Sequence, residues 1–568
     1  MLKQWKLKTT DADALTVLSD NGTIHPVVAK ILVTRGIATK DDAAGFLSPS
    51  FSAMLDPYLM LGMEEAVTRL LTARRNKEKV CIYGDYDVDG ITGTALLVSF
   101  FRTVGMECGY FIPNRFDDGY GLNIEAIEHI NSSGASLIVS VDCGITAVDE
   151  ALFCRKLAMD LIIVDHHSPR ETVPDACAVL NPLLPGCQYP FKFLAGVGVA
   201  FNLLVALRSA LRNEGAFAEQ SEPDLRQWLD LVALGTIADV VPLTGQNRIY
   251  AFHGLRQLTS SVKPGIQALK NVAGVTGPVN CGQVAFRLGP RLNAAGRMES
   301  AVPGVDLLLS ENHGEPKCIA DDLDAANSER QAIERRILDE AVAMLESSGN
   351  FPHCRSIVLA ADSWHQGVVG IVASRLVERY HRPTILMAIG EDGIVKGSGR
   401  SIPGFHLLEA LTPCAAHLER FGGHRYAVGV SLSVDKLAFF SASFEDEARR
   451  LLSEDDLIPR LDIDVEVQPE DISIELAQEL QLMEPFGAGN PEPVLLMKNM
   501  TVVERRTVGD GHLRLRLTRD GIQFNAIAFR MATCDTSGPV DLAFFPEMNL
   551  WNGSSKLQLR VKDLRPAE

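Results

Sequence analysis

Short apolar segments alternate with amphipathic segments from residue 79 to about residue 310. The apolar segments are VCIYGD (80–85), ECGYFIP (107–113), SLIVSVD (136–142) and LIIVDHH (161–167), and NIEAIEHINSSG is one of the helical stretches between them. Apolar runs of this length that alternate with helices are typical of parallel strands buried on both faces of a sheet. The pattern therefore predicts an α/β domain with a doubly wound parallel sheet.

A long charged segment follows this domain. Between residues 316 and 347, apolar side chains recur close to helical spacing, and the other faces carry many charges. The apolar positions are Ile319, Leu323, Ala326, Ile333, Ile337, Ala341 and Leu345. A long helix with a mostly polar surface often bridges two domains. Strands and helices resume at residue 355 and run to about residue 453, which predicts a second α/β domain after this connecting helix.

The last part of the chain has the pattern of short antiparallel strands. HLRLRLT (512–518) alternates strictly, the RDG turn leads into IQFNAIAF (522–529), and an NGSS turn precedes KLQLRVKDL. About five such strands predict a small OB-like β-barrel. The expected divisions are a helical segment at 1–75, the first α/β domain at 76–310, the connecting helix at 311–350, the second α/β domain at 351–455 and the barrel at 456–568.

Acidic residues and histidines follow the predicted strands of the first domain. They are Asp85, Asp87 and Asp89 after the first strand, Asp142 after the third, and Asp165, His166 and His167 after the fourth. Asp239, in GTIADVVPL, lies near the end of a later helical stretch. In an open parallel sheet the carboxyl ends of the strands meet at the edge where ligands bind. We therefore expect these side chains to converge.

The residue types in this cluster favour a pair of divalent cations. Clustered carboxylates repel one another and raise their own pKa values, and a bound cation removes that cost. Oxygen and imidazole ligands without cysteine suit Mn²⁺ or Mg²⁺. More carboxylates than one ion needs indicate two ions, about 3.5–4 Å apart in two-metal hydrolases. Each motif alone also fits a turn or a helix cap, and only their occurrence together favours a metal site.

Composition narrows the class of protein. The 568 residues carry a net charge of −18, which argues against a general nucleic-acid coating protein. Residues 501–568, however, hold ten Lys or Arg and eight Asp or Glu, so the predicted barrel is slightly basic. No signal peptide and no apolar run of the ~18–20 residues that span a membrane are visible. The eleven cysteines form no CxxC pair, as expected for reduced thiols in the cytoplasm.

Four motifs of the first domain resemble those of the DHH phosphoesterase superfamily: DYDVDG, VDCG, DHH and GTIADVVPL. RFGGHRYAVG (420–429) resembles the GGH motif of its companion DHHA1 domain. GPRLNAAGRM (289–298), WHQGVVGIVASRL (364–376), GSGRS (397–401) and PFGAGNPEP (485–493) also match. Over nearly the whole chain, these motifs resemble the bacterial single-strand-specific DNA exonucleases of this superfamily.

The resemblance implies a DHH domain and a DHHA1 domain joined by a long helix, followed by an OB-like domain. It implies removal of nucleotides from a free 5′ end of single-stranded DNA with two Mn²⁺ or Mg²⁺ ions, in DNA repair and recombination. The implied partners are a single-strand-binding protein and a RecQ-type helicase. The implied protein is a cytoplasmic monomer, associated with the nucleoid during repair, without a membrane partner.

The resemblance also assigns roles in the acidic cluster. Asp87 and Asp142 would hold one ion, and Asp89, Asp142, His166 and Asp239 the other. His167 would contact the scissile phosphate, and Asp165 would orient an imidazole. Many family members carry histidine four residues before the middle aspartate, where this chain has Tyr83. Because a tyrosine hydroxyl is a poor ligand at neutral pH, Asp85 or water is expected to complete the first ion's coordination.

Substrate contacts are expected from both α/β domains and from the barrel. By resemblance, the path of the 5′ end includes Arg115, Arg287, Arg291, Ser398 and Arg400, and His424 offers a polar contact. Arginine suits phosphate because its guanidinium group binds two oxygens at once. Strand alternation places Arg514 and Arg516 on one face of the barrel. Trp551 is a candidate for stacking on a base, and packing inside the barrel is the alternative.

Three other functions fit parts of the pattern. A phosphodiesterase for very short oligonucleotides or cyclic dinucleotides would need neither the connecting helix nor the barrel. A non-catalytic DNA-binding scaffold would not need the complete set of acidic residues. A metal-dependent pyrophosphatase leaves the barrel unexplained.

Overall fold

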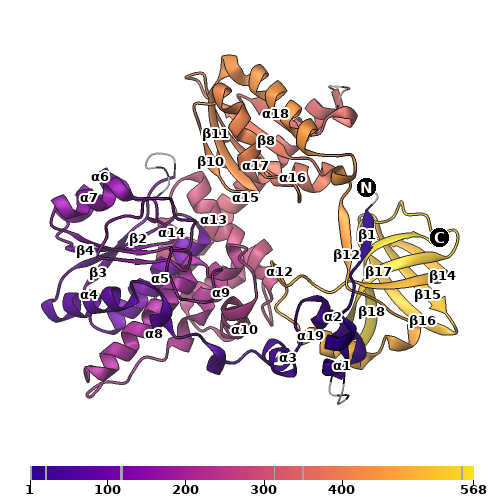
Figure 1. Ribbon diagram of the computed structural model, residues 1–568, viewed down its shortest axis with the longest axis horizontal. Coiled ribbons are helices and arrows are strands. Elements are labelled where there is room, and N and C mark those ends of the chain that lie inside the picture. The colour runs from indigo at the N-terminus through magenta and orange to yellow at the C-terminus, as the bar shows by residue number, and fades with distance from the viewer. Residues whose placement is uncertain are drawn as a thin grey trace.

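The protein folds into three lobes (Figure 1). The computed structural model describes residues 3–567 except 20, 21, 23, 116–118, 120, 313, 348, 350, 552 and 553. The first α/β domain and its helical extension form one lobe, the second α/β domain forms another, and the C-terminal barrel forms the third.

The sheet of the first domain has five strands, all parallel, in the order β3-β2-β4-β5-β6. The strands are β2 (Val80–Gly84), β3 (Cys108–Phe111), β4 (Leu137–Val141), β5 (Asp160–Val164) and β6 (Ala178–Leu180). The four predicted strands are β2 to β5, so the predicted doubly wound sheet is confirmed. β6 is a short edge strand that the sequence pattern did not predict.

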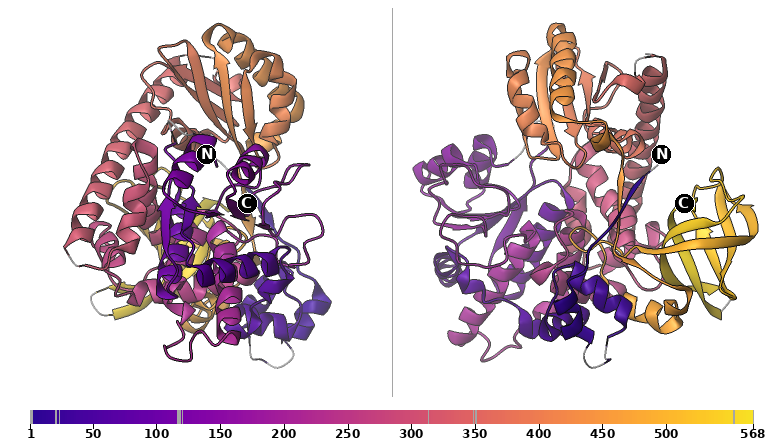
Figure 2. Two further views of the ribbon diagram at one scale, coloured as in Figure 1. Left: turned by 90° about the vertical axis from the view of Figure 1, so that its left-hand side faces the viewer. Right: turned by 45° about the vertical axis from the view of Figure 1, so that its right-hand side comes forward.

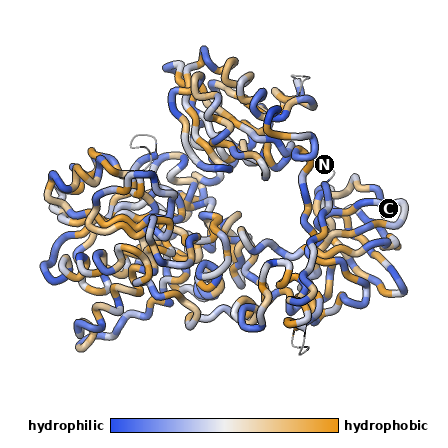
Figure 3. Tube along the Cα trace, viewed as in Figure 1, coloured by the Kyte–Doolittle hydropathy of each residue, from blue (hydrophilic) through white to orange (hydrophobic). Residues whose placement is uncertain are grey.

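Successive side chains of β2 point to opposite faces of the sheet and so belong to two different apolar cores. Val80 and Ile82 join the larger core with α4 (Met63–Asn76), α5 (Val88–Thr103) and α8 (Gly196–Asn213). Cys81 and Tyr83 join a smaller core under α6 (Ile124–Ser132) and α7 (Val148–Lys156). Helices therefore cover both faces of the sheet, and apolar residues concentrate along its central strands (Figure 3).

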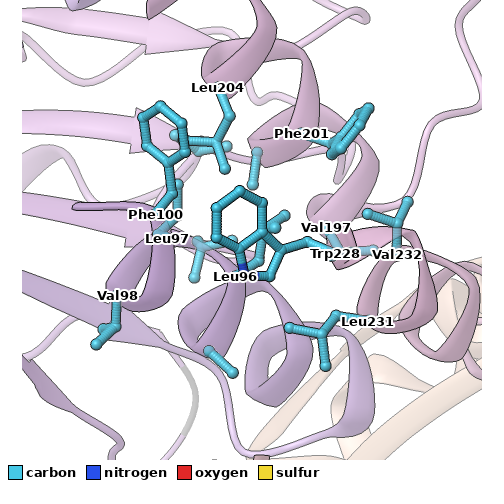
Figure 4. Close-up of a cluster of buried hydrophobic side chains, with 14 of the residues drawn as sticks. Leu96, Leu97, Val98, Phe100, Val197, Phe201, Leu204, Trp228, Leu231 and Val232 are labelled. Carbon is cyan, nitrogen blue, oxygen red and sulfur yellow. The ribbon is translucent and has the colours of Figure 1, made fainter. Parts of the chain in front are cut away.

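A helical extension follows this sheet. Its helices are α9 (Leu229–Ala238), α10 (Gly245–Ser260), α11 (Pro264–Val272), α12 (Cys281–Gln283), the π-helix η4 (Val284–Leu288), α13 (Gly289–Met298) and α14 (Val302–Leu309). Helices α5, α8 and α9 meet in a dense apolar cluster (Figure 4). At its centre the rings of Phe100 and Trp228 lie edge to face, 5.8 Å apart.

Truncation of Phe100 is expected to cost about 3–5 kcal/mol of folding free energy. Phe100 has 0% exposed surface and contacts Trp228, so Phe100→Ala leaves a cavity and removes the aromatic contact. Denaturant unfolding, followed by the tryptophan fluorescence of the protein, measures the loss. The matched control is Phe439→Ala, because Phe439 is 64% exposed and its removal opens no cavity. Equal losses in the two variants would contradict the central place of Phe100 in this core.

The long helix α15 (Glu315–Ser347) joins the two α/β domains, as the sequence predicted (Figure 2). In its first half, Ala320 and Leu323 belong to the large core of the first domain. In its second half, Ile337, Ala341 and Leu345 pack with α16 (Val369–Tyr380) of the second domain. One rigid helix therefore sets the distance between the two domains.

The second α/β domain has a mixed five-stranded sheet in the order β10-β11-β9-β8-β7. The strands are β7 (Ile357–Ala361), β8 (Thr384–Ile389), β9 (Ile394–Arg400), β10 (Arg420–Gly423) and β11 (Ala427–Ser433). Only β7 and β8 are parallel. Helices α17 (Leu407–Leu411) and α18 (Leu437–Leu451) share one core with this sheet, and α15 and α16 share another.

The C-terminal domain is a closed barrel of the OB type. Its strands are β13 (Val465–Glu466), β14 (Leu495–Val508), β15 (His512–Arg519), β16 (Ile522–Ala528), β17 (Val540–Trp551) and β18 (Ser554–Pro566). The strand order is β13-β14-β15-β16-β18-β17, and pairing of β14 with β17 closes it. The predicted barrel is confirmed. Among the described residues, no helix combines the length and the apolar character needed to cross a lipid bilayer.

The N-terminal segment is divided between two lobes. β1 (Gln4–Leu7) pairs in parallel with β12 (Arg460–Ile463), and α1 (Ala12–Ser19) and α2 (Pro26–Thr34) join the core of the barrel. In contrast, α4 packs on the parallel sheet of the first domain. The helical segment expected at 1–75 therefore contributes to two separate cores.

A buried arginine ties the barrel to the first domain. Arg248, in α10, is 3% exposed and donates to the carbonyls of Phe46, at the end of α3 (Lys40–Leu47), and of Met483, after α19 (Ile474–Gln481). It also donates to Glu484 O at 2.8 Å, and its guanidinium carbon lies 3.9 Å from the centroid of the Phe46 ring. Arg248 thus holds the N-terminal segment and the loop between α19 and β14 of the barrel domain on α10.

Candidate active site

The acidic residues after β2 lie on a tight turn. Asp87 caps α5: its Oδ1 accepts from the backbone N–H groups of Asp89 (2.9 Å) and Gly90 (3.2 Å). A Cβ atom at Gly84 would lie 2.1 Å from Thr94 Oγ1, and one at Gly90 would lie 2.5 Å from Asp85 N. The two glycines therefore allow the close turn that brings three carboxylates to the edge of the sheet.

Carboxylates and imidazoles from four elements converge at this edge. One group consists of Asp85, Asp87 and Asp142, and a second of Asp89, His166 and Asp239; in each, the ligand atoms lie within 4.8 Å of one another. His166 Nε2 lies 3.1 Å from Asp142 Oδ1, 3.6 Å from Asp239 Oδ2 and 3.8 Å from Asp89 Oδ2. Asp142 therefore lies between the two groups.

The electrostatics of the cluster fit divalent cations. Burial, followed by the charges of neighbouring carboxylates, raises the pKa values of Asp85, Asp142 and Asp239 well above the usual range. The same causes raise the pKa of Asp89 to about 7. Asp85 Oδ1 and Asp239 Oδ2 are buried without a hydrogen-bond partner. A cation would supply both the missing partner and the missing positive charge.

The backbone at the cluster is strained. Asp142 and Val240, which directly follows Asp239, have φ values of 66° and 62°. Non-glycine residues adopt this left-handed conformation rarely, and most often at functional sites. A Cβ atom at Gly196 would lie 2.8 Å from Asp142 Cβ, so the start of α8 packs directly against the strained aspartate.

The two histidines differ in environment. Burial, and next the charge of His167, lowers the pKa of His166 to about 4, so this imidazole is neutral, as a metal ligand must be. Burial also lowers the pKa of His167, but a 2.7 Å hydrogen bond to Asp165 and its charge outweigh this effect and raise the pKa to about 9. Asp165 also accepts from His166 N and Ile145 N, so it orders the whole DHH turn.

A basic pocket of about 400 Å³ lies between the two α/β domains. Arg115 lines it from the first domain, and Gly367, Ser398, Arg400 and Gly429 line it from the second. Arg400 Nη1 donates to Ser398 Oγ at 2.9 Å, so two of the residues predicted for substrate binding are in direct contact. Three of the predicted substrate residues, Arg115, Ser398 and Arg400, therefore meet here.

The sequence analysis missed Arg297. Burial, followed by the charges of Arg115 and Arg400, lowers the pKa of Arg297 to about 10, and its Nη1 donates to Gly367 O. In the described part of the chain, none of these three arginines forms an ion pair with a carboxylate. Three neighbouring guanidinium groups outside any such ion pair are suited to bind an anion. The signal in the sequence was the second arginine of GPRLNAAGRM.

Three family models match the three lobes. They are "DHH family, N-terminal domain" at residues 79–236, "DHHA1 domain" at 355–450 and "RecJ OB domain" at 463–563. The single-stranded-DNA-specific exonuclease RecJ of Escherichia coli is 38% identical over 585 residues, which cover 100% of both chains. The chain belongs to the RecJ family. The Bacillus subtilis RecJ is 39% identical, and the match covers 100% of this chain and 71% of that protein.

A solved RecJ structure has the same arrangement. The crystal structure of RecJ from Thermus thermophilus in complex with Mn²⁺ superposes with a TM-score of 0.85 at 31% identity. The match covers 100% of this chain and 80% of that chain. A second structure of the Thermus RecJ was solved with Mg²⁺, at a TM-score of 0.78 and 29% identity. RecJ proteins are thus known with both cations that the acidic cluster favours.

Tyr83 lies away from the ligand atoms of this RecJ-family chain. Its ring packs in the smaller core, and its hydroxyl donates to Gly121 O at 2.9 Å. Strand alternation sends this side chain under α6 and α7. In its place, the structure brings Asp85 into the group with Asp87 and Asp142.

The other predicted substrate residues lie outside the basic pocket. Arg291 pairs with Asp324 of α15 at 2.8 Å and donates to Arg287 O, and Arg287 donates to Gly274 O at 3.2 Å. These contacts fasten α13 to its neighbours, which sequence motifs alone did not reveal. His424 follows β10, and burial together with the charge of nearby His167 lowers its pKa.

The structure describes the side chains of two of the three barrel residues that were predicted to contact DNA. Arg514 and Arg516 lie on the exposed face of β15, opposite buried Leu513, Leu515 and Leu517, as alternation predicted. Arg516 pairs with Glu504 at 2.7 Å on this surface. The side chain of Trp551 lies outside the part of the chain that the structure describes.

Proposed function

We propose that this RecJ-family chain removes nucleotides from the 5′ end of single-stranded DNA with two divalent cations, Mn²⁺ or Mg²⁺. The observation that carries this proposal is the pair of ligand groups around Asp142, with Arg115 of the arginine pocket near enough for its charge to affect the pKa of Asp85. The names of its RecJ relatives, "single-stranded-DNA-specific exonuclease", support the substrate.

The ligand groups assign the chain's residues to the two cations. Asp87 and Asp142, with Asp85, would hold one; Asp89, His166 and Asp239, with Asp142, would hold the other. When bound, such a pair supplies Lewis-acid activation of water and of the phosphodiester. Asp165 keeps His167 oriented through Nδ1, and a protonated imidazole there stabilises negative charge on the phosphoryl oxygens.

The arginine pocket supports recognition of a strand end. A terminal phosphate carries more negative charge than an internal phosphodiester, so it gains more from Arg115, Arg297 and Arg400 together. Such a pocket beside the metal ligands would fix the distance between the bound end and the scissile bond. The 5′ polarity follows if the end held here is the 5′ phosphate.

The barrel is suited to hold the strand behind the cleavage point. Arg514 and Arg516 offer exposed positive charge for the phosphates. By resemblance to the family, we also propose that the protein works in DNA repair and recombination at the nucleoid. There it would act beside a single-strand-binding protein and a RecQ-type helicase.

Degradation of end-labelled DNA tests this function. With Mn²⁺, we expect stepwise loss of nucleotides from the 5′ end of a single strand, no attack on a blunt duplex and no activity after EDTA treatment. A strand blocked at its 5′ end serves as the matched control. Attack from the 3′ end at the same rate would contradict the polarity. A clear preference for di- and trinucleotides over long strands would favour the short-oligonucleotide phosphodiesterase instead.

A further inference from the structure

Asn247 joins two separate loops of the first domain. It lies near the start of α10, has 0% exposed surface, and is no candidate ligand. Its Nδ2 donates to Pro242 O at 3.1 Å and to Phe193 O. One carbonyl belongs to the loop between α9 and α10, and the other to the loop before α8.

The loop before α8 and the first two residues of α8 contact two ligands of one group. The backbone of Leu194, next to Phe193, hydrogen-bonds to His166. Gly196 N donates to Asp89 Oδ2 at 2.6 Å, and Val197 N donates to Asp89 Oδ1 at 2.9 Å. The orientations of the Asp89 carboxylate and the His166 ring therefore depend on where this loop lies.

The loop between α9 and α10 carries the third ligand of the same group. Asp239 ends α9, and Val240 follows in the left-handed conformation at a φ of 62°. A β-branched residue keeps this conformation only where its surroundings hold it. Pro242, two residues on, is the residue whose carbonyl Asn247 binds.

We propose that Asn247 is a positioning residue for the Asp89, His166 and Asp239 group. Its two hydrogen bonds keep two loops at a constant distance from each other. One loop orients Asp89 and His166, and the other carries Asp239. The proposal rests on the metal centre of the proposed function. Both hydrogen bonds of the Asn247 amide go to loops of this group, so its effect is specific to one of the two cation sites.

The PFGAGNPEP stretch supports the same loop from outside the domain. Leu243 N donates to Ala488 O at 2.7 Å. A Cβ atom at Gly489, where φ is 68°, would lie 2.8 Å from Pro242 Cβ. This loop of the barrel domain, between α19 and β14, thus contacts the residue that Asn247 binds, which gives the motif a role in holding Asp239.

Titration of Mn²⁺ into the full-length, DNA-free protein by calorimetry tests the proposal. We expect two sites in the wild type. Asn247→Ala should weaken one site about 10- to 100-fold, the range known for residues that support metal ligands, and change the other less than about threefold. The matched control is Gln246→Ala: Gln246 is also buried in α10, at 2% exposed, but bonds to Leu55, Asn202 and Tyr250 instead of either loop.

Two more variants make the result decisive. Gly489→Ala, at an exposed position, should weaken the same site because its Cβ must displace Pro242. Val240→Gly should restore part of the Mn²⁺ affinity of Asn247→Ala, because glycine adopts a positive φ without strain. If Asn247→Ala does not fold, the Mn²⁺ affinity of Gly489→Ala alone tests the proposal.

Equal Mn²⁺ affinities in wild type, Asn247→Ala and Gly489→Ala would overturn the proposal. So would an equal loss in Gln246→Ala, which would indicate general loosening of α10. The proposed function fails in a different way, if wild-type protein with two bound Mn²⁺ ions leaves single-stranded DNA intact. The two failures are therefore distinguishable.

Discussion

Asp142→Asn should lower the rate of single-strand cleavage at least about 10³-fold and, at the same time, raise the thermal stability of the metal-free protein. Asp142 lies between the two ligand groups, 3.1 Å from His166 Nε2, so its loss affects both cation sites. Asparagine is the chosen replacement because it tolerates the φ of 66° at this position better than most residues.

The gain in stability follows from the sign of the pKa shift. In the folded protein the pKa of Asp142 is raised well above its usual value by burial and by Asp89. A carboxyl group with a raised folded-state pKa destabilises the fold as pH rises through its unfolded pKa, about 4. The amide has no such cost. The melting temperature in EDTA should therefore rise at pH 7, and the difference between variant and wild type should shrink towards pH 4.

Asp149→Asn provides the control for this experiment. Asp149 is exposed in the first turn of α7, and its replacement changes the net charge by the same amount without touching the cluster. We expect wild-type cleavage from it. Residual activity of Asp142→Asn above about 10% of wild type would exclude a ligand role in both cation sites. A lower melting temperature in EDTA would contradict the electrostatic argument.

Arg400→Gln should lower kcat/KM for a 5′-phosphorylated single strand about 10²-fold, with a much smaller effect on a 5′-hydroxyl strand. Arg400 donates to Ser398 Oγ, lines the interdomain pocket together with Arg115, and lies near Arg297. The loss of one charge-assisted pair of hydrogen bonds to a terminal phosphate accounts for a decrease of this size. Initial rates on the two substrates measure the difference.

The melting temperature of Arg400→Gln shows whether a lower rate comes from weaker phosphate binding or from a less stable fold. Because burial and Arg115 lower the pKa of Arg400, removal of its charge relieves repulsion in the phosphate-free protein. The melting temperature should therefore stay the same or rise. Arg425→Gln, at an exposed position after β10, is the matched control and should cleave both substrates normally. Equal losses on the phosphorylated and hydroxyl strands would contradict recognition of the end phosphate.

The elements of this fold could be predicted from local patterns. The strands β2 to β5, the long helix α15 and the alternation of β15 each follow from the period of apolar residues within one segment. The candidate metal ligands that follow the strands could be named because all parallel strands of a sheet end at one edge. The motif resemblance added the family, which the matches over the full chain established.

Other parts of the site could not be predicted, because they depend on which segments meet. Arg291 resembled a substrate contact but binds Asp324, and Arg297, a few residues later in the same motif, is beside the pocket arginines. Tyr83 stands where many family members carry histidine, yet strand alternation sends it into the opposite core. Both outcomes depend on the packing of surfaces far apart in sequence.

The sequence by itself determined the three lobes, the acidic cluster and the family. Periodicity within a segment and the order of motifs are local properties, and a single chain displays them directly. Only the tertiary structure decided that α1 and α2 belong to the barrel core, that Arg297 lies near the two arginines of the interdomain pocket, and that Asn247 links two loops. In each case a polar or apolar group is buried against a segment that is distant in the sequence. Which distant segments meet is determined only when the chain folds.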